Sequence, residues 1–173
     1  MLRGLAGGAL AGALWGVFAR LFMRLLTDDP QFSWSGTLAI VGLATVAGAC
    51  VGLVHGARVS GRSPWWRLAA LPALVLFAGP GSLLAPAAVG MAAVLRGRTA
   101  ARVLGALLVA VPVVVVVSGS PPPTVTQQAG LALMVLSAAP LGWGLGEVVR
   151  RWRIRPAPAP ESAAARTPAA ALA

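Results

Sequence analysis

The sequence contains little charge and few of the residues that carry catalytic chemistry. Of its 173 residues, 10% are charged, and the chain has one histidine, one cysteine, four acidic residues and no tyrosine. A soluble domain has about 25% charged residues, so these side chains are too few to cover a surface that faces water. The composition therefore excludes an ordinary soluble globular domain.

The shortage of reactive side chains also narrows the chemistry. The chain has a single cysteine, Cys50, which lies in an apolar run. One cysteine cannot form a disulfide within the chain or a cysteine-cluster metal site. The sequence has no HExxH, no GxSxG and no Walker A pattern, the spacings that hold a catalytic zinc, a nucleophilic serine or a nucleotide phosphate. We expect neither an enzyme nor a bound metal or cofactor.

What the sequence has in abundance is apolar side chains, which make up 58% of the residues. Several apolar runs reach the roughly 20 residues that cross a hydrocarbon core of about 30 Å as a helix. The predicted fold class is all-α, a polytopic transmembrane helix bundle of about six membrane segments. These predicted segments are residues 5–26, 37–57, 66–78, 82–95, 103–118 and 129–149.

The third and fourth segments are predicted to form a short hairpin. As one helix, residues 65–95 would be about 46 Å long at 1.5 Å per residue, longer than a bilayer is thick. Gly79-Pro80-Gly81, in the middle of this stretch, is a turn signal. We therefore predict two helical arms of about 20 Å each, which form either a re-entrant hairpin or two short spans.

The arginines predict the orientation of the bundle. With the hairpin in place, the connections 27–36, 79–81 and 120–128 lie on one side and contain no arginine. The arginine-rich connections and both termini lie on the other side, which an excess of basic residues marks as cytoplasmic. The sequence therefore predicts a protein of the cytoplasmic (inner) cell membrane with both termini inside. It consists of a transmembrane domain, residues 1–155, and a disordered Pro/Ala-rich tail, residues 156–173.

The net charge of +10 does not indicate a nucleic-acid partner. The arginines lie at the ends of apolar segments, where basic charge sets membrane orientation, and they do not form the clustered patch that binds phosphate backbones. The expected partners are the lipid bilayer, an anionic lipid, and a second copy of the chain or another membrane protein.

Glycines recur at every fourth position in the first two segments. Small residues at this spacing let helix backbones approach closely, as in GxxxG packing. The spacing predicts either packing between helices of one chain, or self-association or a pore lining. The residues are Gly4, Gly8, Gly12 and Gly16 in the first segment, and Gly48, Gly52 and Gly56 in the second.

Two arginines, Arg20 and Arg24, continue the glycine series toward the far side of the membrane. An arginine near the middle of a membrane costs roughly 2.5–3.5 kcal/mol on insertion scales. The pair either anchors the helix at the interface or binds an anionic head group together with Asp28, Asp29 and Trp34. The two acids have no histidine or further acid nearby, so they give little support to a metal site.

Two further ionisable residues, His55 and Glu147, lie near the predicted cytoplasmic ends of their helices. Ionisable groups inside a membrane are candidates for function. The two residues form either an intramembrane ion pair or part of a proton path. Alternatively, Glu147 forms an ordinary helix-end salt bridge with Arg150 or Arg151, which follow it by three and four residues.

Residues 15–24, Trp-Gly-Val-Phe-Ala-Arg-Leu-Phe-Met-Arg, and residues 29–37, Asp-Pro-Gln-Phe-Ser-Trp-Ser-Gly-Thr, carry a family resemblance. This part of the chain resembles a group of small uncharacterised multi-pass membrane proteins of high-GC bacteria. The similarity covers most of the membrane part, with Gly79-Pro80-Gly81 and Gly142-Trp143-Gly144 as weaker landmarks. The resemblance implies a membrane location and no particular activity.

Together these patterns predict a non-enzymatic helical bundle that assembles with itself or with a partner as an accessory membrane subunit. The alternative is a small transporter or channel component, because broken helices mark transport sites. An enzyme acting on lipid phosphates, with Arg20 and Arg24 as clamps, is disfavoured because no nucleophile or base is evident beside them.

Overall fold

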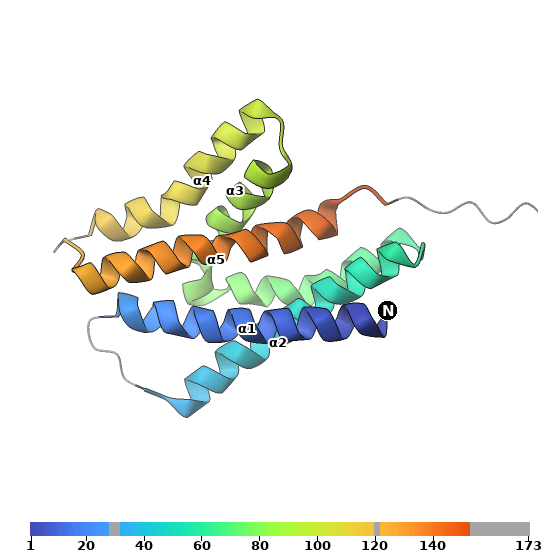
Figure 1. The fold of residues 1–173 in the computed structure, drawn as a ribbon, viewed down its shortest axis with the longest axis horizontal. Helices are drawn as coiled ribbons and strands as arrows, with labels where there is room; N and C mark the ends of the chain where they lie inside the picture. The colour runs from blue at the N-terminus through green and yellow to red at the C-terminus, as the bar shows by residue number, and fades with distance from the viewer. Residues whose placement is uncertain (28–31, 120–121, 153–173) are drawn as a thin grey trace, which may run out of the picture.

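In the computed structural model, residues 1–27, 32–119 and 122–152 are described, and they contain helices but no strand. The helices lie side by side in one bundle (Figure 1). The all-α prediction is confirmed, and the predicted tail, residues 156–173, lies outside the described residues. The α-helices are α1 (Leu2–Leu26), α2 (Trp34–Val59), α3 (Leu84–Arg96), α4 (Thr99–Val117) and α5 (Val125–Val149), and the 3-10 helices are η1 (Pro64–Phe77) and η2 (Gly79–Leu83).

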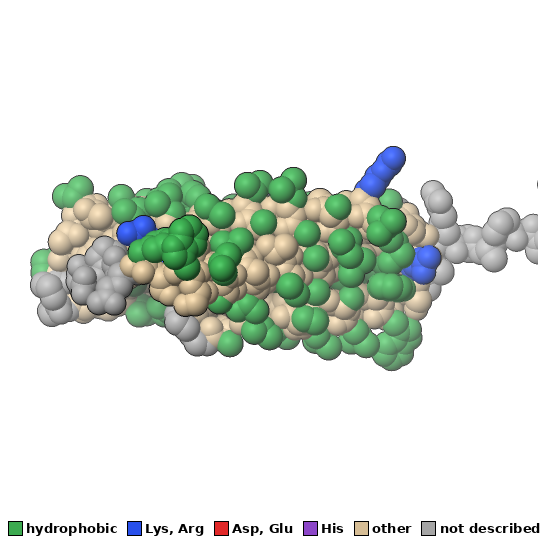
Figure 2. Space-filling model, turned by 90° about the horizontal axis from the view of Figure 1, so that it is seen from below, with side chains coloured by type: hydrophobic (Ala, Val, Ile, Leu, Met, Phe, Trp, Pro, Cys, Tyr) green, Lys and Arg blue, Asp and Glu red, His purple; other side chains and the backbone are tan. Residues whose placement is uncertain are grey.

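The bundle carries apolar side chains on its outside. Four helices of the described part, α1, α2, α4 and α5, are long and apolar enough to cross a membrane. Large apolar residues such as Leu10, Leu38 and Leu107 are exposed over more than half of their surface, and Figure 2 shows such side chains spread over the visible face. In the hydrocarbon core, helices can satisfy their backbone internally while their side chains face lipid. The fold therefore fits a membrane protein.

The chain turns back on itself between η1 and α3. Residues Pro64–Phe77 and Gly81–Arg96 are bent by 115° relative to one another. Arg58, which precedes this pair, and Arg96, which ends it, both bind the carboxylate of Glu147. Both ends of the pair therefore lie at the same end of the bundle, as the predicted hairpin requires.

The predicted length of the first arm is wrong, because η1 is a 3-10 helix. It runs over 14 residues, and at the 3-10 rise of about 2.0 Å per residue it is about 28 Å long. The α-helical rise assumed from the sequence gave about 20 Å. Pro72 lies inside η1, where it lacks the N–H that an α-helix would use. The first arm is therefore almost as long as the hydrocarbon core is thick.

Capping residues explain why two helices begin before their predicted starts. The Ser33 hydroxyl accepts a hydrogen bond from the backbone N–H of Gly36 at 3.2 Å, which starts α2 three residues early. Thr124 and Gln127 form a reciprocal capping box at the start of α5, with distances of 2.8 and 3.3 Å. These caps satisfy backbone N–H groups that a helix start leaves open.

Away from the arginine-rich end, α1, α3 and α5 share an apolar core. Trp15 of α1 also donates a hydrogen bond from Nε1 to the Ser137 carbonyl of α5 at 3.1 Å. Helix α1 is thus fixed to α5 here by both apolar packing and a polar contact. The core residues are Ala19, Phe22, Leu84, Leu131 and Met134.

Candidate functional site

A buried carboxylate lies at the arginine-rich end of the bundle. The side chain of Glu147, in the last turn of α5, is only 2% exposed, and it is the one acidic residue in the described ranges. Basic side chains from α2, α3 and the end of α5 surround it. We call this group the Glu147 cluster; it consists of Glu147, His55, Arg58, Arg96 and Arg150.

Both carboxylate oxygens of Glu147 are bound. Oε2 lies 3.0 Å from Nδ1 of His55 and also accepts a hydrogen bond from Nη2 of Arg58. Oε1 accepts a hydrogen bond from Nη2 of Arg96 at 2.7 Å, and Nη1 of Arg150 is 3.4 Å away. A buried charge without partners would cost several kcal/mol, so these contacts are what permits the carboxylate to lie inside the bundle.

The Glu147 cluster connects three helices and has an excess of positive charge. His55 and Arg58 come from α2, Arg96 from α3, and Glu147 from α5. Three guanidinium groups face one carboxylate, so the charges of these arginines and Glu147 sum to +2. The cluster therefore joins the ends of α2, α3 and α5 and makes this end of the bundle attractive to anions.

Some of the contacts in this cluster were predicted from the sequence. The structure brings His55 and Glu147 together across 92 positions of the chain, and Arg150 lies three residues after Glu147 as the helix-end bridge predicted. Arg58 and Arg96 were not predicted as partners, because they lie 89 and 51 positions from Glu147. The one sequence signal for them is the arginine pattern, which predicts that both residues lie on the same side of the membrane.

The two glycine series face each other across the contact between α1 and α2. A Cβ at Gly4 would lie 2.6 Å from the Gly52 carbonyl oxygen, and a Cβ at Gly8 would lie 2.8 Å from the Gly52 Cα. Real Cβ atoms do not approach so closely, so no other residue fits without moving the helices apart. The structure thus places the series against each other within one chain. Gly4, Gly8, Gly12 and Gly16 face Gly56, Gly52, Gly48 and Ala44.

At the other end of the bundle, Arg20 of α1 points toward α2. Its Nε donates a hydrogen bond to the Thr37 hydroxyl at 3.1 Å, and the side chain is partly buried. This contact gives the deeper arginine of the pair a partner in the described residues. The predicted partners Asp28 and Asp29 lie outside the described residues.

Arg24, one turn further along α1, is exposed and stacks on an aromatic side chain. Its guanidinium carbon lies 5.6 Å from the centroid of the Phe32 ring. Phe32 in turn meets Trp34 edge to face, with ring centroids 4.9 Å apart, and Trp34 is 71% exposed. The structure therefore brings Arg24 and Trp34 to one aromatic cluster, while Arg20 is bound separately to α2.

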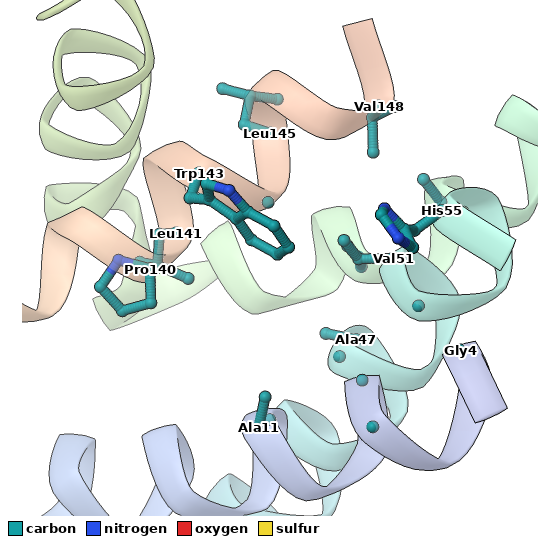
Figure 3. Close-up of a pocket in the computed structure, with 18 of the residues that line it drawn as sticks. Gly4, Ala11, Ala47, Val51, His55, Pro140, Leu141, Trp143, Leu145 and Val148 are labelled. Atoms are coloured by element: carbon teal, nitrogen blue, oxygen red, sulfur yellow. The ribbon is translucent and has the colours of Figure 1, made fainter. Parts of the chain in front are cut away.

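A cavity that the sequence did not predict opens between α1, α2, η1 and α5 (Figure 3). Its volume is about 780 Å³, and we call it the lateral groove. Its walls are mainly apolar, and the Trp143 ring of α5 lies beside the His55 ring of α2, with ring centroids 6.3 Å apart (Figure 3). Arg3, Arg67 and His55 also line it. Because it arises from the packing of four elements, no local sequence pattern marks it.

Comparison of the chain with protein-family models, with curated proteins and with solved structures gives no match. The resemblance to small membrane proteins of high-GC bacteria stays a prediction. The structural features that bear on function are therefore the Glu147 cluster, the glycine contact and the lateral groove.

Proposed function

We propose that this chain is a non-enzymatic helical bundle that serves as an accessory subunit in the cytoplasmic membrane. The observation that supports this proposal is the Glu147 cluster. A catalytic acid or base must exchange a proton with its substrate, whereas Glu147 is 2% exposed and both of its oxygens are bound by basic side chains. We infer that this carboxylate fixes α2, α3 and α5 together.

The arginines support an orientation with this end of the bundle in the cytoplasm. Met1 lies against Gly56, and Arg150 lies at the Glu147 cluster, so both ends of the described chain are at the same end of the bundle. The connections after α2 and α3 also end there. Because cytoplasmic loops carry the excess of basic residues, we infer that both termini are inside.

The accessory role is tested by what the protein assembles with. Chemical cross-linking in intact membranes, followed by purification in mild detergent and mass measurement, should give one defined species. We expect either a fixed oligomer or a complex with one membrane protein in constant stoichiometry. A monomer under every cross-linking condition would contradict the accessory role.

The alternative function, a small transporter or channel component, is favoured by one observation. The broken segment formed by η1, η2 and α3 lies beside the lateral groove, and Leu74 and Phe77 of η1 line that groove. Broken helices beside a cavity are typical of transport sites. Proton and potassium flux into liposomes separates the two functions: we expect flux equal to that of protein-free liposomes, and flux above that level would support the transporter.

A further inference from the structure

We propose that the lateral groove binds one anionic lipid from the leaflet on the arginine-rich side of the membrane. The lipid chains would lie along α1, and the phosphate would lie near Arg3 and Arg67. Three observations support this site: the length of the groove, its apolar walls, and the basic side chains among its lining residues.

The length of the groove matches one leaflet. Its lining runs along α1 from Met1 to Trp15, which is about 21 Å at 1.5 Å per residue. Half of a bilayer that is about 40–45 Å thick with its head groups is also about 21 Å. The volume of about 780 Å³ falls in the range of roughly 300–1,000 Å³ that ligand sites occupy.

The walls of the groove suit lipid chains. Gly7 and Ala11 of α1, Leu74 of η1 and Trp143 of α5 line the space. A Cβ added at Gly7 would meet no heavy atom within 4 Å, so the structure leaves room there. At the far end the groove reaches Trp15, whose Nε1 is bonded to α5, and it extends no further along α1.

The arginine-rich end of the groove suits a phosphate. Arg3 is exposed and makes no polar contact with the described residues. Arg67 donates from Nη2 to the Arg150 carbonyl at 2.7 Å, while its Nε is buried without a partner. Guanidinium groups bind phosphate through charge-assisted hydrogen bonds, and exposed Arg3 can bind a head group in this way. Arg67, which also stacks on Trp152, adds positive charge at the same end of the groove.

Charge also favours a lipid over a second copy of this chain. The one carboxylate of the described part, Glu147, is already bound by three arginines. A second copy placed along the groove in the same membrane orientation would bring its own arginine-rich end beside the first. Like charges brought together at an interface are unfavourable, whereas an anionic head group is complementary.

The test uses the full chain in nanodiscs made from equal amounts of phosphatidylcholine and phosphatidylglycerol. Bound lipid is counted by native mass spectrometry after extraction into mild detergent. Gly7→Leu places a side chain inside the groove, and Gly42→Leu is its matched control, because a Cβ at Gly42 also meets nothing within 4 Å and Gly42 does not line the groove. Arg3→Gln removes a basic head-group partner, and Arg102→Gln removes an exposed arginine on α4 that does not line the groove.

We expect the wild type, Gly42→Leu and Arg102→Gln to retain one phosphatidylglycerol. Gly7→Leu should lose it while keeping its melting temperature, because its Cβ has free space. Arg3→Gln should lower the preference for phosphatidylglycerol over phosphatidylcholine about fivefold, the typical effect of one arginine beside anionic lipid. Equal lipid retention in Gly7→Leu and wild type would overturn the proposal, as would a dimer in wild type that Gly7→Leu converts to monomer.

Discussion

Arg96, the last residue of α3, donates a hydrogen bond from Nη2 to Oε1 of Glu147 in α5 at 2.7 Å. Arg58 of α2 binds the other oxygen of the same carboxylate. The residues between Arg58 and Arg96 must therefore leave this end of the bundle and come back to it. These two contacts to one carboxylate thus hold together both ends of the segment that contains η1, η2 and α3.

Replacing Glu147 by glutamine should destabilise the bundle strongly. The change leaves Arg58 and Arg96, whose side chains are 13% and 30% exposed, without their counter-charge. Removing one partner of a buried ion pair costs roughly 3–5 kcal/mol, which should appear as a lower melting temperature in detergent. Arg150→Gln is the control: this side chain is 61% exposed, and its loss should cost less than about 1 kcal/mol. Equal melting of both variants would show that the cluster does not stabilise the fold.

Replacing Gly8 or Gly12 by leucine should separate α1 from α2. The new side chains would meet the backbone of Ala44, Gly48 and Gly52, and overpacking of this kind costs roughly 1–3 kcal/mol or more. Gly42→Leu is again the matched control, because its Cβ meets open space. We expect a lower melting temperature for Gly8→Leu and Gly12→Leu but not for Gly42→Leu. Unchanged melting together with a changed oligomer size would instead assign these glycines to an interface between copies.

The path of the chain could be predicted from the sequence because its signals are local. Glycine spacing, arginine positions and the turn at Gly79-Pro80-Gly81 indicated the segments and the hairpin. A Cβ at Gly81 would overlap the Leu76 carbonyl, which explains why glycine stands at this turn. The 3-10 form of η1 could not be predicted, since apolar residues around Pro72 are equally compatible with an α-helix.

The candidate sites were predicted only where their residues share a helix or a membrane side. Glu147 and Arg150 are three residues apart, and His55 could be linked to Glu147 because the sequence predicts both residues near the cytoplasmic ends of their helices. The lateral groove depends on how α1, α2, η1 and α5 pack, and each contributes small or apolar side chains that resemble any other membrane helix. Only the packed structure shows that Gly7 faces empty space while Gly8 faces α2.

Arg20→Gln should affect binding of an anionic lipid at the end opposite the Glu147 cluster more than Arg24→Gln does. Arg20 is partly buried and bound to Thr37 between α1 and α2, whereas Arg24 is exposed and stacks on Phe32. A head group held between helices depends more on the deeper, better-oriented guanidinium. Lipid that copurifies from native membranes, measured by mass spectrometry for wild type and both variants, checks this order. Equal retention in all three would leave both arginines as interface anchors.

We infer that the arginine-rich end of this hairpin-containing bundle faces the cytoplasm. Single cysteines at Ser60, Thr99 and Ser118, introduced one at a time with Cys50→Ala, test this orientation directly. All three positions are exposed: Ser60 and Thr99 lie at the arginine-rich end of the bundle, and Ser118 lies at the other end. With an impermeant thiol reagent on intact cells, we expect labelling at Ser118 and none at Ser60 or Thr99, with all three labelled after permeabilisation. Labelling at Thr99 but not at Ser60 would show that residues 64–96 cross the membrane once, and labelling at Ser60 and Thr99 but not at Ser118 would reverse the orientation.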